Sequence, residues 1–168
     1  MDTDGRRLAE PEFPDDDGSA SPAVVAALAA YECDPDTGDR TVLAELQDTR
    51  VLVPVVATLG EVEHDEQGLA HDKSSDMAAV LMTGRDGRTA LLCFTSSETM
   101  RTWNPEARPV AVSARLAARA ALQDGADALV VDVAGPVLYV VDGQDLRDLA
   151  DDLVLRRVGQ GWGWTRPV

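Results

Sequence analysis

The chain has 168 residues, with 30 Asp or Glu against 15 Lys or Arg, so its net charge is −15. A chain this acidic repels nucleic-acid phosphates and anionic membrane surfaces, and it contains no basic stripe that would offset the repulsion. The hydrophobic fraction of 45% excludes a wholly disordered protein, no apolar run is long enough for a membrane span, and two distant cysteines exclude a disulfide-rich scaffold.

The first twenty residues differ in composition from the rest of the chain. They include the acidic run Asp15–Asp17 and few large apolar side chains, so they bury too little surface to offset the loss of chain entropy. They also lack the apolar segment of a secretory signal. We therefore expect a disordered acidic tail over residues 1–20 and one folded domain over residues 21–168.

Two helices are predicted before the first strand. Ser21 suits the cap of the first helix, and Pro22 suits its first turn. The apolar stripe of this helix has helical spacing and consists of Val24, Ala27, Leu28 and Tyr31. The turn-forming segment 34–38 should end it, and a short helix should follow over residues 40–48.

Strands are predicted next. Residues 50–57 read RVLVPVVA, a strongly β-forming run, and Pro54 cannot donate a ladder hydrogen bond, so we expect an edge strand or a bulge. A hairpin should follow, with strands at 77–83 and 89–95 around the turn Gly84–Gly87. Both hairpin strands are apolar on both faces, which is typical of central strands.

The second half of the chain continues this alternation. The segment Thr95–Glu98 matches a capping box and predicts a helix through Trp103. Further strands are expected at 109–112, 128–133 and 137–141, and further helices at 113–123 and 142–152. The elements together predict an α+β fold, a mixed β-sheet of about five strands packed by roughly three to four helices.

Four pieces of the chain resemble, in their order and spacing, the N-terminal domain of the SseB family. They are RVLVPVV at 50–56, ALLCFTSSETMRTWNPEARPVAV at 90–112, AARAALQDGADALVVDVAGPV at 117–137 and LRDLA at 146–150. The segment KSSDMAAVLMTGRDGR at 73–88 is similar to the version found in high-GC bacteria. The resemblance covers residues 50–150, leaves the first 49 residues outside, and implies a cytoplasmic bacterial protein with no established activity.

The best candidate for chemistry is the polar segment 64–76. Both histidines of the chain, His64 and His71, lie here with Asp76, and imidazoles and carboxylates are common ligands of Zn, Mn or Fe. A histidine beside a carboxylate could also act as a general base. The spacing of the two histidines matches no recognised ligand motif, so a flexible acidic loop is the favoured interpretation.

Other reactive side chains have structural interpretations. Cys93 lies in an apolar strand and should behave as a small hydrophobic residue, and the hydroxyls of residues 95–97 suit a helix cap. Asp132 lies opposite its apolar strand neighbours, so it should face solvent or a cross-strand partner, with a ligand-facing carboxylate as the alternative. Trp162 and Trp164, in the tail 154–168, either anchor a partner or fold back over the sheet or the first helix, which we favour.

Two functional hypotheses follow. The first is a non-enzymatic interaction or regulatory domain that binds another protein, or a second copy of itself, through a sheet edge or the Trp tail. The alternative is a small-molecule- or metal-binding enzyme that uses the 64–76 segment. No pattern in the sequence calls for a cofactor, and no nucleic-acid or membrane partner is expected.

Overall fold

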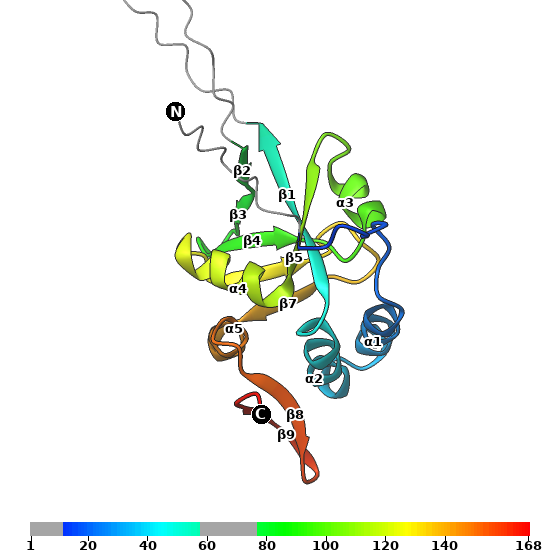
Figure 1. Ribbon diagram of the computed structural model, residues 1–168, viewed down its shortest axis with the longest axis vertical. Coiled ribbons are helices and arrows are strands. Elements are labelled where there is room, and N and C mark those ends of the chain that lie inside the picture. Colours follow the sequence, from blue (N-terminus) through cyan, green and yellow to red (C-terminus); the bar gives the residue numbers. More distant parts are fainter. Residues whose placement is uncertain (1–11, 58–76) are drawn as a thin grey trace, which may run out of the picture.

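The computed structural model describes residues 12–57 and 77–168, and Figure 1 shows their arrangement. The order of helices and strands agrees closely with the sequence prediction. In chain order the elements are α1 (Pro22–Cys33), α2 (Pro35–Leu46), β1 (Arg50–Ala57), β2 (Met77–Ala79), β3 (Leu81–Thr83), β4 (Thr89–Cys93), α3 (Ser97–Trp103), β5 (Arg108–Ser113), α4 (Ala114–Gln123), β6 (Ala128–Val131), β7 (Tyr139–Asp142), α5 (Gly143–Ala150), β8 (Val154–Val158) and β9 (Gly161–Thr165).

The fold is α+β, as predicted, but its strands form three small sheets rather than one of about five strands. The largest sheet has the order β3-β4-β6-β7, and the second has the order β2-β1-β5. Strands β4 and β6 are parallel, whereas the other neighbours in these sheets are antiparallel. The third sheet is the C-terminal hairpin β8–β9. The parallel pair brings two carboxyl strand ends side by side.

The sequence predicts that Pro54 marks an edge strand or a bulge. The first alternative is wrong, because β1 lies between β2 and β5. Pro54 faces Pro109 on the β5 side in a pair without mutual hydrogen bonds, so neither residue needs a donor there. On its other side β1 changes neighbours. Leu52 exchanges hydrogen bonds with Phe94, and the ladder with β2 begins at Val55. Between these pairings Pro54 O accepts from Val80 N over 3.3 Å, while Val80 O accepts from Leu92 N over 3.2 Å, so no carbonyl lacks the donor that Pro54 cannot supply.

The hydrophobic core lies on both faces of β4. Leu91 and Cys93 face the cluster that includes α1, α2, α4 and α5, while Leu92 and Phe94 face a second cluster with α3. The predicted hairpin is confirmed for β3 and β4, with Thr83 opposite Thr89 across the turn, whereas the first part of its predicted first strand is β2, which pairs with β1 in the other sheet. The prediction of two central strands holds for β4 and is wrong for β3, which is an edge strand with Leu81 42% exposed.

Helices α1 and α2 pack against each other. The break between them, predicted over residues 34–38, is shorter than expected. Helix α2 begins at Pro35, and the Asp34 side chain accepts a hydrogen bond from Thr37 N–H, so only Asp34 separates α1 from α2. Gly38 lies inside α2, where an added Cβ would come within 2.5 Å of Tyr31 Cα. The glycine that looks like a helix breaker in the sequence therefore permits the close approach of the two helices.

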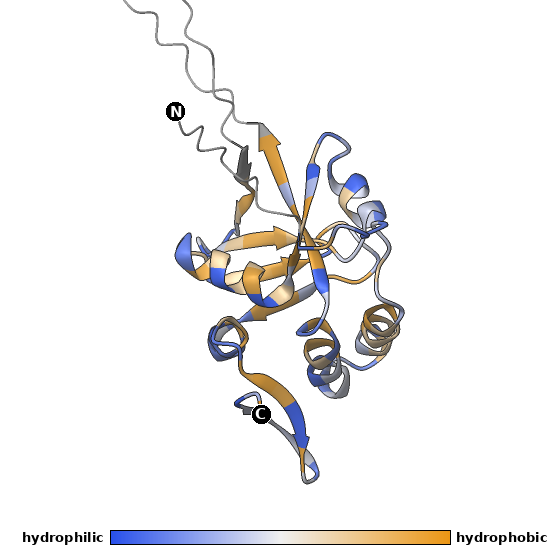
Figure 2. Ribbon diagram, in the orientation of Figure 1, coloured by the Kyte–Doolittle hydropathy of each residue, from blue (hydrophilic) through white to orange (hydrophobic). Residues whose placement is uncertain are grey.

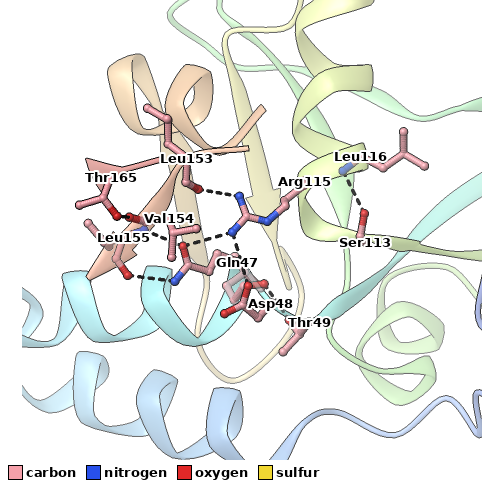
Figure 3. A network of polar contacts seen from close by, with 11 residues as sticks. Gln47, Asp48, Thr49, Ser113, Arg115, Leu116, Leu153, Val154, Leu155 and Thr165 are labelled. Atoms are coloured by element: carbon pink, nitrogen blue, oxygen red, sulfur yellow. Dashed lines mark hydrogen bonds and ion pairs between the residues drawn. The ribbon is translucent and has the colours of Figure 1, made fainter. Parts of the chain in front are cut away.

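The C-terminal hairpin is attached to the domain by a buried polar network, shown in Figure 3. Gln47, at the end of α2, donates from Nε2 to Leu155 O over 3.0 Å and accepts from Leu155 N over 2.8 Å. Arg115 of α4 donates to Leu153 O over 2.6 Å. Because Gln47 pairs with both backbone groups of Leu155, it occupies the position that a neighbouring strand would take.

Residues 12–20 have a defined place in the structure, whereas the sequence predicts a disordered tail over residues 1–20. We call residues 12–20 the N-terminal strap; residues 1–11 lie outside the described ranges. Arg50 donates from Nη2 to Asp16 Oδ1 over 2.6 Å and to Ser19 O over 2.8 Å, and its side chain is 9% exposed. This partly buried ion pair supplies the ordering that composition alone does not suggest. Within the described ranges, no helix is long and apolar enough to cross a membrane.

Candidate functional site

A cleft of about 650 Å³ lies beside the carboxyl ends of the parallel strands β4 and β6. Residues 95–97 follow β4 and Asp132 follows β6, so both connections reach the same edge of the sheet. Ligands of open α/β sheets commonly bind at such an edge. Helix α1, helix α3 and the N-terminal strap complete the walls of the cleft.

Asp132 is the central polar residue of this cleft. It is 2% exposed and accepts three hydrogen bonds, from Thr95 N (2.8 Å), Thr95 Oγ1 (2.6 Å) and Thr99 Oγ1 (2.7 Å). The expectation that Asp132 faces solvent is therefore wrong. Asp132 instead pairs with a neighbouring segment of the chain, which is close to the other expectation. The carboxylate ties the end of β4 and helix α3 to the end of β6.

The error about Asp132 has a local cause. Strand β6 ends at Val131, and Asp132 has a φ of +53°, so the side-chain alternation of the strand no longer applies. Asp is one of the few residues with a side chain that adopts the left-handed region without a large cost. Gly135 then closes the turn, since a Cβ there would lie 2.9 Å from Asp132 Cβ.

The capping box predicted over Thr95–Glu98 is displaced by one residue. Ser96 caps α3 and its Oγ accepts from Thr99 N over 3.1 Å, whereas the Thr95 hydroxyl donates to Asp132. Thr99 Oγ1 lies 3.1 Å from Ser96 O and also donates to Asp132, so Glu98 takes no part in the cap contacts described here. Within the described residues, these hydroxyls bond to a carboxylate and to backbone groups, and both histidines of the chain lie outside those residues.

The strap is connected to the same network through Arg50. Besides its bonds to the strap, Arg50 donates from Nη1 to Thr95 O over 2.6 Å. Ser97 N–H donates to Gly18 O over 2.8 Å, and a Cβ on Gly18 would meet Ser97 Oγ. Gly18 also has a φ of +80°, which favours glycine. One wall of the cleft is therefore fixed to its floor by a buried cation and a close backbone contact.

The walls of the cleft combine apolar side chains with exposed charged ones, most of them acidic, which we call the rim. Val25 is 51% exposed on α1. The other apolar lining residues are Leu28, Ala29, Pro136 and Val137. The charged lining residues besides Asp132 are Asp17, Glu32, Glu98 and Arg101. The pKa of Asp17 is lowered because its carboxylate accepts from the backbone and side chain of Ser19, so the carboxylate stays charged at neutral pH.

The predicted metal ligands His64, His71 and Asp76 lie outside the described residues. In the ranges 12–57 and 77–168, no group of three or more His, Cys, Asp and Glu side chains is arranged to hold a metal ion. Cys93 is fully buried, and burial, with Asp132 nearby, raises the pKa of its thiol. The interpretation of Cys93 as a small hydrophobic residue agrees with this position.

The two tail tryptophans fold back against the domain, although not where we expected. Both are partly buried against the main core, and Trp164 Nε1 donates to Asp145 Oδ1 over 2.9 Å. Arg157 lies over the Trp162 ring at 4.7 Å from its centre. The hairpin they belong to packs beside α2 and α5, not on the sheet or the first helix. A role in partner binding for Trp162 and Trp164 stays a prediction.

Sequence reasoning missed the cleft because its lining comes from five separated segments. The signal that was available is the pair of polar groups after two parallel strands, Thr95–Ser97 and Asp132, but the parallel pairing was not foreseen.

The chain matches the family described as SseB protein N-terminal domain over residues 24–148. This match begins before residue 50, so α1 and α2 lie inside it, contrary to the expectation that the first 49 residues lie outside. No curated protein and no solved structure matches the chain. The family match covers most of the chain, which therefore belongs to the SseB protein N-terminal domain family.

Proposed function

We propose that this chain is a non-enzymatic domain of the bacterial cytoplasm that binds a segment of a protein partner in the cleft beside β4 and β6. The observation that carries the proposal is the state of the polar groups on the cleft floor. Asp132, Thr95 and Thr99 are bonded to one another at 2.6–2.8 Å, so they shape the cleft instead of offering free groups for catalysis.

The walls of the cleft support a peptide-like occupant. Val25 is 51% exposed and would lose this exposure under an apolar side chain of a partner. Glu32 and Glu98 are both exposed at the rim, where carboxylates favour basic side chains. An apolar side chain flanked by Lys or Arg therefore has the chemistry that this cleft accommodates.

The test uses a short fluorescein-labelled peptide that alternates Arg with Leu, and its counterpart that alternates Glu with Leu. We expect the full chain to bind the Arg peptide and to reject the Glu peptide in fluorescence anisotropy. Val25→Asn should weaken binding by roughly tenfold or more, since it places a polar group against the buried apolar side chain without changing the charge of the cleft. Leu116→Asn is the matched control, because Leu116 is 41% exposed in the first turn of α4 and does not line this cleft.

Equal binding of both peptides, no binding of the Arg peptide, or unchanged binding by Val25→Asn would refute the proposal. The enzyme hypothesis for segment 64–76 has a separate test. If it is right, freshly purified chain contains Zn, Mn or Fe by mass spectrometry, and the variants His64→Ala and His71→Ala lose both the metal and the thermal stabilisation that it provides.

A further inference from the structure

The C-terminal end of the chain is basic, in contrast to the acidic chain as a whole. The last fifteen residues contain Arg156, Arg157 and Arg166 and no acidic side chain, although the chain as a whole has a net charge of −15. Arg156 and Arg157 are exposed, and the adjoining Val158 is 57% exposed. The acidic cleft suits an apolar side chain flanked by basic ones. The chain has this combination of side chains near the turn of its own C-terminal hairpin.

The hairpin is held at its base and free at its tip. Gln47 bonds both backbone groups of Leu155, and Trp164 bonds Asp145 of α5, which fixes the first residues of β8 and the last of β9. Beyond them the hairpin extends past α2 and α5 at one end of the molecule (Figure 1). Figure 2 shows the hydrophilic arginine segment followed by an apolar position close to the turn. The tip is thus a preorganised projection, which lowers the entropic cost of inserting it into a partner.

We propose that the hairpin tip of one copy of this chain, with Arg156, Arg157 and Val158, docks into the cleft of a second copy. The arginines lie against Glu32 and Glu98 at the rim, and Val158 covers Val25. The inference rests on the proposed function, because it names the partner that occupies the same cleft.

The geometry of the anchor excludes the tip of the same copy as the occupant. The base of β8 is bonded to the end of α2, and α2 lies between the hairpin and α1 (Figure 1). Docking between copies is therefore heterologous: in a docked pair, the copy that donates its tip keeps a free cleft and the other copy keeps a free tip. Such contacts produce rings when the rotation between copies closes and open chains when it does not.

The salt dependence of this assembly follows from two electrostatic effects of different range. Two chains that each carry a net charge of −15 repel each other at long range, and this repulsion dominates at low salt. At about 0.15 M salt the screening length is about 8 Å, so the long-range repulsion is reduced while the close arginine–glutamate pairs persist. We expect association to be strongest at intermediate salt and weaker both below and above it.

The experiment is sedimentation velocity of the full chain over a range of concentrations. The wild-type chain should form larger species as its concentration rises. The tip variant Arg156→Glu/Arg157→Glu and the cleft variant Glu32→Arg/Glu98→Arg should each associate roughly a hundredfold more weakly, because each places like charges together. An equimolar mixture of the two variants should associate again, since each variant's tip then faces a cleft of opposite charge on the other.

The matched control for the tip variant is Arg85→Glu/Arg108→Glu, which makes the same change in net charge at exposed positions outside the tip and the cleft. It should associate as the wild-type chain does, with slightly weaker affinity from the added net charge. A monomeric wild-type chain, tip and cleft variants that associate like the wild type, or a mixture that stays monomeric would each overturn the inference. If the wild-type chain is monomeric and still binds the Arg peptide through Val25, the proposed function stands and only self-docking is wrong.

Discussion

Asp132 and Gln47 are both buried polar residues that join distant segments, but they do so in different ways. Asp132 is charged and accepts from three donors that belong to residues after β4, so it holds the floor of the cleft. Gln47 is neutral, donates and accepts once each with Leu155, and holds the arm β8–β9. Removing a charged acceptor leaves several donors unsatisfied in the interior, whereas removing the amide frees only one residue of a terminal hairpin.

The comparison predicts the largest loss of stability at Asp132. Asp132→Ala should lower the free energy of unfolding by about 3–5 kcal/mol in urea denaturation, because the donors of Thr95 and Thr99 lose a buried charged partner. Asp132→Gly removes the same bonds but adopts a φ of +53° without strain. It should therefore be about 1 kcal/mol less harmful than the alanine variant. A loss below about 1 kcal/mol for Asp132→Ala would contradict the central role of this carboxylate.

Gln47→Leu should cost less and act more locally. Leu155 N–H and C=O lose their partner, which corresponds to about 2–3 kcal/mol. Hydrogen exchange should speed up for the amides of β8 and β9 and stay unchanged in β4 and β6, if the hairpin detaches by itself. Gln123→Leu, at the exposed end of α4, is the control and should leave exchange in the hairpin unchanged. Equal acceleration throughout the sheet would show that the hairpin is not an independent unit.

Arg50 extends the Asp132 network to the N-terminal strap. Arg50→Met should destabilise the fold by about 1–2 kcal/mol, since Asp16, Ser19 O and Thr95 O lose their shared donor. A glutamate-specific endopeptidase should then cut after Glu12 faster than in the wild-type chain. The control is Arg88→Met, whose ion pairs with Asp86 and Asp142 are more than half exposed on the arginine, so a change within about 0.5 kcal/mol is expected. Unchanged cleavage in Arg50→Met would mean that the strap is held by other contacts.

The smallest effect is expected at Tyr139, which donates from its hydroxyl to Asp39 of α2 over 3.1 Å. Tyr139→Phe should cost about 1 kcal/mol at neutral pH. Burial and the nearby Asp39 raise the pKa of Tyr139, so the folded state keeps this proton more tightly than the unfolded state does. Stability is therefore unaffected below the unfolded pKa of about 10 and falls as the pH rises above it.

Urea midpoints at pH 8 and pH 11 check this sign. The wild-type chain should lose more stability between these two values than Tyr139→Phe does, and the difference between the two chains isolates Tyr139 from other groups that titrate in this range. An equal loss in both chains would show that the hydroxyl of Tyr139 does not release its proton on unfolding.

Most local elements could be predicted from the sequence because they depend on neighbouring residues. The stripe of α1, the β3–β4 turn, the approximate start of α3 and the closure of α4 by Gly125 follow from side chains within a few positions of one another. The family resemblance was found for the same reason, since it rests on contiguous pieces of sequence.

The tertiary structure alone decided how these elements meet. The central place of Pro54, the contact at Gly38 and the burial of Asp132 depend on partners that propensity and periodicity do not specify. Thr95 and Asp132 are 37 positions apart, and Gln47 and Leu155 are 108 apart. A polar side chain has the same local pattern whether water or a distant donor satisfies it, so only the packed chain distinguishes a surface carboxylate from the floor of a cleft.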